Sequence, residues 1–256
     1  GGVDPSPGVV AKTEQYDGTT WAEVNDMNEG RNRHAGCGTI TSALALGGSP
    51  ANSPTRSAKV ESWNGYTWTE VADLSAVKRF VGAAGNSTAA IAFGGEGASP
   101  DGETESWNGS SWTEVANMNN GRIILAGCGT QTSALGVGGQ TPPGRVANTE
   151  AWNGSAWTEV NDLNTARSGL VAAATDSTAA VAFGGSIPPT TNVVESWNGT
   201  NWSNDQSMTT SRERFAGNGT NTSALAAGGD PTPYTAATEE WNGTGLVTTT
   251  VTTTSD

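Results

Sequence analysis

A short phrase, Trp-Asn-Gly-x-x-Trp, returns along this chain at nearly constant intervals. It starts at residues 63, 107, 152 and 197, with variants at 16 and 241, so the interval is 44–47 residues. A glycine pair with the same period follows a few small or apolar residues; the pairs begin at Gly47, Gly94, Gly138, Gly184 and Gly228. Repeats of this kind fold into equal units that bury apolar surface by packing against their neighbours.

Turn residues divide each repeat into four short strands, here named a, b, c and d. In the third repeat we expect strand a at residues 125–129, b at 134–137, c at 149–152 and d at 157–160. The glycine pair ends strand b, and Asn153-Gly154 supplies the positive-φ turn between c and d. A unit of four short antiparallel strands with this period is typical of a propeller blade, so the predicted fold is an all-β propeller.

The number of blades follows from the inner strands, because only they must surround the axis. Five a–b pairs precede the five glycine pairs, whereas c–d pairs number six. We therefore expect residues 1–256 to form one propeller domain of five blades, with six as the alternative. Residues 1–24 and 238–256 are expected to close the ring, with either 21–24 or 246–251 as the outer strand of the last blade.

Composition excludes several functions. The 25 acidic and 12 basic residues give a net charge of −13, so no nucleic-acid partner is expected. The sequence has no long apolar stretch, so membrane insertion is not expected. One histidine and two cysteines are too few for a His/Cys metal centre, and no cofactor is expected.

Cys37 and Cys128 fall at one slot of strand a, filled elsewhere by Ala84, Ala174 and Asn218, and are expected to pack as buried small residues without a disulfide.

The repeat resembles that of the kelch family. The resemblance rests on an apolar strand closed by Gly-Gly, two aromatics and a later arginine, as in Gly139, Trp152, Trp157 and Arg167. It covers residues 14–241 and implies the propeller fold, without implying an activity. The low-charge repeats also resemble kelch-like proteins of bacteriophages, marine ones especially, which implies a tail fibre or virion appendage.

Residues that recur in every repeat are expected to be structural, because rotation about the axis spreads them around a ring. The tryptophans of the c–d motif are expected to pack between blades, and the glutamates two residues before the first aromatic to bond backbone or repeat cations. These structural residues are Trp63, Trp68, Trp107, Trp112, Trp152, Trp157, Trp197, Trp202, Glu61, Glu105, Glu150, Glu195, Arg122, Arg167 and Arg212.

Unrepeated polar residues are the candidates for binding. His34 takes a slot that is Val81, Leu125, Val171 and Phe215 in the other repeats. In a four-stranded blade the variable b–c loops and the d–a connections share one side, and we expect the ligand there. The candidate ligand-binding residues are Arg33, His34, Arg145, Arg214 and Tyr234.

Three functions remain open. The first is a non-enzymatic interaction module that binds a glycan or protein of a cell surface, from the virion surface or extracellularly. The second is a secreted propeller hydrolase or lyase acting on polysaccharide, and the third is a structural virion decoration protein. We favour binding because no set of unrepeated acids and bases converges in the sequence, so no catalytic residue is assigned.

Overall fold

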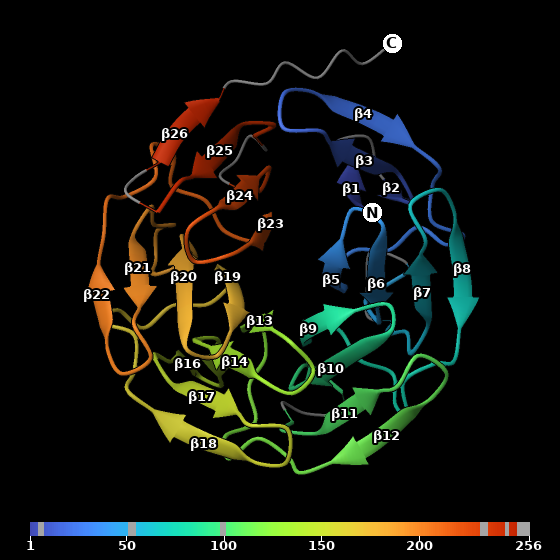
Figure 1. Ribbon diagram of the computed structural model, residues 1–256, viewed down its shortest axis with the longest axis horizontal. Helices are drawn as coiled ribbons and strands as arrows, with labels where there is room; N and C mark the ends of the chain where they lie inside the picture. Colours follow the sequence, from blue (N-terminus) through green and yellow to red (C-terminus); the bar gives the residue numbers. More distant parts are fainter. Residues whose placement is uncertain (5–7, 51–54, 98–100, 231–234, 244–245, 250–256) are drawn as a thin grey trace. The chain divides into compact units, whose positions relative to one another are not determined.

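The computed structural model describes residues 1–4, 8–50, 55–97, 101–230, 235–243 and 246–249 (Figure 1). These residues are all-β, and the fold is a five-bladed β-propeller of four-stranded antiparallel blades, as the repeats predict. Within them no helix is long and apolar enough to cross a membrane. The chain divides into two compact units, Gly1–Ile123 and Ile124–Asp256, described separately below.

The first unit contains blades 1 and 2 and two hairpins. Blade 1 consists of β5 (Ala35–Thr39), β6 (Ser42–Leu46), β7 (Val60–Trp63) and β8 (Trp68–Val71). Blade 2 consists of β9 (Gly82–Asn86), β10 (Ala89–Phe93), β11 (Thr104–Trp107) and β12 (Trp112–Val115). The hairpins are β1 (Gly2–Asp4) with β2 (Gly8–Val10), and β3 (Thr13–Tyr16) with β4 (Trp21–Val24).

The second unit contains blades 3 to 5. Blade 3 consists of β13 (Ala126–Gly129), β14 (Ala134–Val137), β17 (Thr149–Trp152) and β18 (Trp157–Val160). Blade 4 consists of β19 (Val171–Asp176), β20 (Ala179–Phe183), β21 (Val194–Trp197) and β22 (Trp202–Asn204). Blade 5 consists of β23 (Ala216–Gly219), β24 (Ala224–Ala227), β25 (Thr238–Trp241) and β26 (Leu246–Thr249), and β15 (Gln140–Thr141) pairs with β16 (Gly144–Arg145) in the b–c loop of blade 3.

The strands of blade 3 follow the predicted ranges, except that strand a begins at Ala126. In blade 5, β26 pairs with β25 and forms the outer edge, whereas Trp21–Val24 pairs with β3. Of the two alternatives for that edge, the structure therefore has the carboxy-terminal strand. Closure of a ring by residues 1–24 and 238–256 stays a prediction.

A bulge in blade 4 corrects two repeat equivalences. The β19–β20 register shifts between Ala174 and Asp176, so this repeat has one extra residue in strand a. The residue equivalent to His34 is thus Leu170, and Val171 was wrong; a Cβ added to Gly185 would lie 3.1 Å from Leu170 Cβ, just as one added to Gly48 would meet His34 Cβ. The cysteine slot is likewise Ala173, which pairs with Val181, and Ala174 was wrong. Cys37 and Cys128 are free thiols on strand a, and burial raises the pKa of each to about 12.

The tryptophans of strand c are buried, and three of them lie in apolar clusters that span two blades of one unit. Trp107 of blade 2 packs with Leu44 and Leu46 of blade 1, and Trp241 of blade 5 packs with Phe183 of blade 4. Each strand c indole also donates to a carbonyl in the a–b turn of its own blade, for example Trp197 Nε1 to Ser177 O at 3.0 Å. This N–H therefore has a partner although its ring is buried.

Strand d tryptophans bond to the preceding element. Trp112 Nε1 donates to Ala72 O of blade 1 at 3.1 Å, and Trp202 Nε1 to Thr149 Oγ1 of blade 3 at 3.1 Å. Trp68 Nε1 donates to Thr13 Oγ1 of β3 at 3.0 Å. These bonds fix the outer strands of one blade against the next.

A repeat cation and a repeat glutamate form a buried ion pair within a blade. Arg31 bonds Glu61, Arg212 bonds Glu239, and Arg167 Nη1 lies 2.9 Å from Glu195 Oε1. These six side chains are at most 1% exposed. The carboxylates also accept backbone amides of the preceding d–a connection, as in Asn164 N to Glu195 Oε2 at 2.7 Å.

Blade 2 has a lysine at this position and a different arrangement. Lys78 Nζ lies 2.7 Å from Glu103 and 3.3 Å from Asp101, while Glu105 accepts the amide of Ser75 at 2.9 Å. Because an ammonium lacks the guanidinium fork, it does not reproduce the arginine bonds to carbonyls and carboxylate together. The remaining repeat pair members, Arg122 and Glu150, are also fully buried.

The glycine pairs join successive blades. The second glycine donates its amide to the carbonyl of the next repeat cation: Gly48 to Lys78 and Gly95 to Arg122 in the first unit, Gly139 to Arg167 and Gly185 to Arg212 in the second. Gly185 has a φ of 106°, and a Cβ there would lie 2.9 Å from Ser168 O. The position therefore requires glycine.

We predict that Gly185→Ala destabilises the protein by at least about 2 kcal/mol, because alanine is strained at this φ and its Cβ meets backbone. The matched control is Gly144→Ala, where a Cβ has nothing within 4 Å. Urea unfolding of both variants measures the difference, and equal midpoints would contradict the role assigned to the pair.

We also predict that Glu239→Ala costs about 3–5 kcal/mol, because it leaves the Arg212 guanidinium buried without its carboxylate. The control is Glu14→Ala, the same repeat position on β3, where the side chain is exposed. Its loss should cost less than about 0.5 kcal/mol. Denaturant unfolding compares the two, and a comparable loss in both variants would refute the assignment.

Candidate functional site

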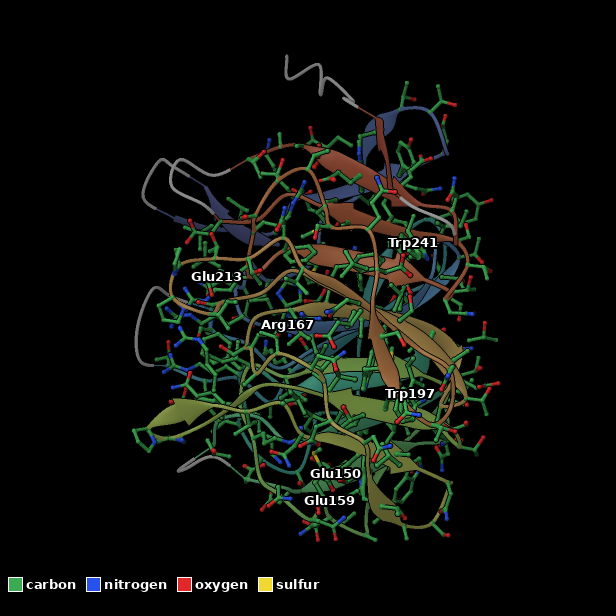
Figure 2. The ribbon with its side chains drawn as sticks, turned by 90° about the vertical axis from the view of Figure 1, so that its left-hand side faces the viewer. Glu150, Glu159, Arg167, Trp197, Glu213 and Trp241 are labelled. Atoms are coloured by element: carbon green, nitrogen blue, oxygen red, sulfur yellow. The ribbon has the colours of Figure 1, made fainter. Side chains whose placement is uncertain are left out.

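The two ends of the blades differ in chemistry. We call the end with the b–c loops and d–a connections the loop side, and the end with the a–b and c–d turns the turn side. Isolated bridges join four of the connections to the residue after a glycine pair, as in Arg79 with Glu96 and Glu213 with Asp230. In the second unit, Arg167 and Glu213 lie toward one edge and Trp197 and Trp241 toward the other (Figure 2).

Every blade has a left-handed residue two positions after the repeat cation, on the loop side. Arg33, Phe80, Ile124 and Arg214 have φ values of 54–58°, and Gly169 has 66°. The amide of Phe80 donates to Arg33 O at 2.9 Å, and in the second unit Gly169 donates to Ile124 O and Arg214 to Gly169 O at 3.0 and 2.8 Å. Neighbouring blades thus hold each other in a conformation that non-glycine residues rarely adopt. Candidates Arg33 and Arg214 both occupy this position and are exposed.

In the first unit, the guanidinium groups of Arg33 and Arg79 lie beside the ring of Phe80. The Arg33 guanidinium carbon lies 5.4 Å from the centroid of the Phe80 ring, and that of Arg79 lies 5.5 Å from it. Both distances are typical of cation–π contacts. Phe80 itself is half-buried.

A carboxylate organises the other two cations of this group. Glu96 accepts Arg79 Nε and Nη2, each at 3.0 Å, and Arg56 Nη2 at 2.7 Å. The bond from Arg79 and then that from Arg56 hold the pKa of Glu96 below its usual value against the effect of desolvation. We call Arg33, Arg56, Arg79, Phe80 and Glu96 the Phe80 cluster. Three arginines and one glutamate give it two excess positive charges in a protein of net charge −13.

Of these five residues the sequence singles out Arg33, and it does not single out Arg56, Arg79, Phe80 and Glu96. The equivalents of Arg79 are Asn32, Ile123, Ser168 and Glu213, so the break from repetition was a usable signal. The contacts themselves depend on the left-handed backbone conformation of Phe80, and a phenylalanine in a sequence does not indicate that conformation.

Two of the other predicted residues, Arg145 and Arg214, belong to the second unit. Arg145 is exposed on β16 in the second unit and donates from Nη2 to Ser186 Oγ at 3.0 Å, so it ties its hairpin to blade 4. Arg214 lies beside Gly169, whose added Cβ would be 3.5 Å from Arg214 Cγ. Tyr234 lies outside the described residues.

His34 is half-buried under the glycine pair of blade 1, with its Nδ1 buried and without a hydrogen-bond partner. Chiefly because of burial, its pKa falls to about 3. The imidazole is therefore neutral at pH 7. Among the described residues, no three His, Cys, Asp or Glu side chains are placed to hold a metal.

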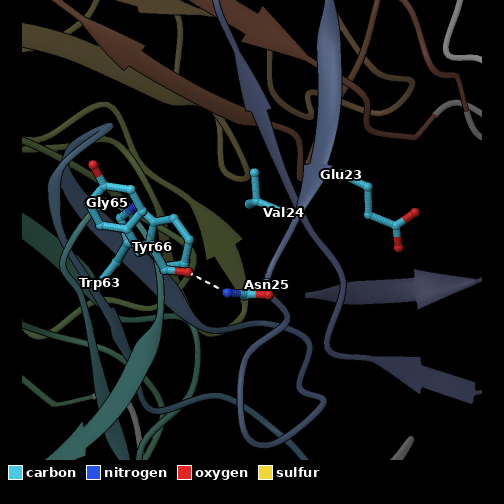
Figure 3. A pocket seen from close by; sticks show the side chains of 6 residues that line it. All are labelled: Glu23, Val24, Asn25, Trp63, Gly65 and Tyr66. Atoms are coloured by element: carbon cyan, nitrogen blue, oxygen red, sulfur yellow. Dashed lines mark hydrogen bonds between the residues drawn. The ribbon is translucent and has the colours of Figure 1, made fainter.

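The turn side of the first unit has a hollow of about 410 Å³ between β4 and the c–d turn of blade 1 (Figure 3). Glu23, Val24, Asn25, Trp63, Gly65 and Tyr66 line it. Tyr66 is 79% exposed, and its backbone is held by Asn25 Nδ2, which donates to Tyr66 O at 2.7 Å. The Glu23 carboxylate points away from the tyrosine (Figure 3) and lies 3.6 Å from the Lys12 ammonium.

Tyr66 is the departure from the repeat at this position. Its equivalents are Thr19, Ser110, Ser155 and Thr200. In the second unit, Asn161 Nδ2 donates to Thr200 O at 2.9 Å, which is the bond that Asn25 makes to Tyr66. The backbone hydrogen bond beside the hollow thus recurs in another blade, whereas the tyrosine ring replaces a threonine or serine.

We predict that His34 makes the protein less stable in mild acid. A pKa of about 3 in the folded state, against about 6.5 unfolded, means that the unfolded chain binds the proton first as pH falls. Its contribution is complete above pH 6.5 and is lost progressively as pH falls toward 3, by roughly 1–2 kcal/mol at pH 5.

His34→Val, which introduces the residue of blade 2, should remove this loss of stability between pH 7 and pH 5. Urea unfolding at pH 7, 6 and 5 tests it, since most carboxylates stay ionised in that window. Parallel pH profiles for the two proteins would show that His34 titrates normally.

No protein-family model matches this chain, and no curated protein matches it.

Proposed function

We propose that this protein is a non-enzymatic interaction module that binds a carboxylate-bearing glycan of a cell surface through the Phe80 cluster. The observation that carries the proposal is the exposed Arg33 guanidinium beside the Phe80 ring on the variable loop side. Sugar rings stack on aromatic faces, and arginine bonds carboxylates with two parallel N–H donors.

The rigid scaffold supports binding more than chemistry. Arg79 and Arg56 are held by Glu96, so the cluster keeps its geometry before a ligand arrives, which lowers the ordering cost of binding. A local excess of positive charge on an acidic chain also selects for anionic ligands. The kelch-like repeats and their resemblance to bacteriophage proteins favour a tail fibre or another virion appendage as the setting.

A polysaccharide hydrolase is the second candidate. Glu213 and Asp230 are bridged partners on the loop side of the second unit, with each amide bonded to the other's carbonyl at 2.8 and 3.0 Å. Such a bridge places two carboxyl side chains near each other, and glycosidases use paired carboxylates. Release of reducing ends by the protein, abolished in Glu213→Gln, would favour this function over binding alone.

We predict that Arg33→Gly weakens binding to uronate- or sialate-containing glycans at least tenfold. Glycine accepts the left-handed conformation, so the variant removes the guanidinium without strain, as Gly169 shows in blade 4. The matched control is Arg214→Gly, which empties the same repeat position in blade 5. A glycan array followed by titration calorimetry measures both variants.

Tyr66→Thr, which introduces the residue that blade 4 has at this position, tests the hollow on the turn side. Loss of glycan binding in this variant, with Arg33→Gly unchanged, would move the site to the turn-side hollow. Binding of neutral and acidic glycans alike, insensitive to salt, would also contradict the proposal.

A further inference from the structure

Two turns of blade 1 expose apolar side chains at positions where the other blades are polar. Tyr66 in the c–d turn is 79% exposed, and Ile40 in the a–b turn is 59% exposed. The carbonyl of Ile40 accepts the strand c indole of its blade, and the residues that do so in blades 2 to 5 are Ser87, Gln131, Ser177 and Asn221. Single exposed apolar residues are ordinary, whereas two on adjoining turns form a patch.

The two turns lie against each other and border the hollow. Trp63 Nε1 donates to Ile40 O at 2.9 Å, and a Cβ added to Gly65 would lie 3.5 Å from Thr41 Cα. Trp63 and Gly65 both line the hollow, together with Tyr66 (Figure 3). The patch of Ile40 and Tyr66 therefore adjoins a cavity of about 410 Å³, which is within the size range of ligand sites.

The polar groups of the hollow are suited to a ligand that donates hydrogen bonds. Asn25 Nδ2 donates to Tyr66 O at 2.7 Å, which leaves Asn25 Oδ1 as an acceptor. Glu23 is the charged residue among those that line the hollow. Its ion pair with Lys12 is 3.6 Å long and at least 60% exposed on both sides, and such pairs contribute little. The hollow thus offers a carboxylate and an amide oxygen to N–H donors.

The Phe80 cluster shows what a ring beside a carboxylate holds in this protein. There the Arg79 guanidinium lies 5.5 Å from the Phe80 ring and bonds Glu96 at 3.0 Å. At the hollow, Tyr66 supplies the ring and Glu23 the carboxylate, but among the described residues no arginine or lysine lies over the Tyr66 ring. The Glu23 carboxylate points away from the ring (Figure 3), and exposed side chains change rotamer within nanoseconds.

We propose that the hollow and the Ile40–Tyr66 patch are a docking site for another protein, which places an arginine side chain beside Tyr66. The guanidinium stacks on the Tyr66 ring, donates to Asn25 Oδ1 and pairs with Glu23, while an apolar residue next to the arginine packs on Ile40. The net charge of −13 favours a partner with a basic surface. Tyrosine and arginine also recur in the hot spots of protein interfaces.

The probe for this site is the blocked peptide acetyl-Gly-Leu-Arg-Gly-amide, titrated into the full chain and followed by NMR of the backbone amides. We expect shift changes confined to Asn25, Ile40, Tyr66 and the residues beside them. The matched peptide has citrulline in place of arginine, which keeps the shape and removes the charge. It should bind roughly fivefold more weakly or worse, because a neutral urea loses the attraction to the ring and to the carboxylate.

Two variants test the role of the ring. Tyr66→Thr should weaken binding of the arginine peptide by roughly fivefold or more and shift the melting temperature by less than about 2 °C, because the side chain is exposed. Thr200→Tyr tests a gain of binding in the second unit, where five of the six lining residues recur in sequence as Glu159, Val160, Asn161, Trp197 and Gly199. It should bring arginine-dependent shift changes to the turn at residue 200.

Binding of the arginine and citrulline peptides with equal affinity, or an arginine peptide that leaves Tyr66 unshifted, would overturn the proposal. Binding of methyl β-glucoside that depends on Tyr66, without binding of the peptide, would also overturn it by assigning the hollow to a neutral glycan. The proposed acidic-glycan site is measured separately. Its binding should be the same in Tyr66→Thr as in the unsubstituted protein, so failure of one site does not imply failure of the other.

Discussion

One buried cation in each repeat joins a blade to its neighbour. Its side chain bonds a carboxylate on strand c of its own blade, as in Arg167 with Glu195, and its carbonyl accepts the second glycine of the preceding blade, here Gly139. Removing a charge from water is costly unless it is paired, and here the buried guanidinium groups of Arg31, Arg167 and Arg212 are each paired with a carboxylate, although their Nε atoms have no hydrogen-bond partner among the described residues. Arg31 donates from Nη1 to Gly47 O and Lys59 O and from Nη2 to Glu61.

The loop-side geometry follows from this joint. Once the cation is held at both ends, the chain must turn sharply to enter strand a, and the residue two positions on becomes left-handed. Its backbone bonds the equivalent residue of the neighbouring blade, as in Arg214 with Gly169, so the fold depends on the backbone there and not on the side chain. The side chain can therefore vary from Arg33 to Phe80 to Gly169, and this freedom creates a variable surface on an otherwise repeated scaffold.

Much of the fold was predictable because repeats report the same local structure several times. The Asn-Gly turns and glycine pairs located strands b, c and d of blade 3, and counting the inner pairs determined five blades. The bulge at Ala174 was not predictable, since one extra residue in strand a looks the same in sequence as one in the loop before it. This is why the equivalents of His34 and Cys37 in blade 4 were displaced by one residue.

The candidate site was predictable only in part. Variation pointed to the loop side and to Arg33, and the neutral state of His34 follows from burial that a sequence does not show. The cluster around Phe80 needs residues from two loops and two d–a connections to meet, and each contact depends on a backbone conformation imposed from the next blade.

By itself the sequence determined the repeat length, the all-β class, the number of blades and the residues that recur as joints, because these depend on local turns and on periodicity. Only the tertiary structure decided which residues become left-handed, which glutamate is left exposed and which side chains converge. Those outcomes depend on packing and hydrogen bonds between neighbouring blades. The physical reason is that a repeat is almost the same sequence everywhere, while its surroundings are not: Glu14 and Glu61 have the same local motif, and only Glu61 has a complete blade around it.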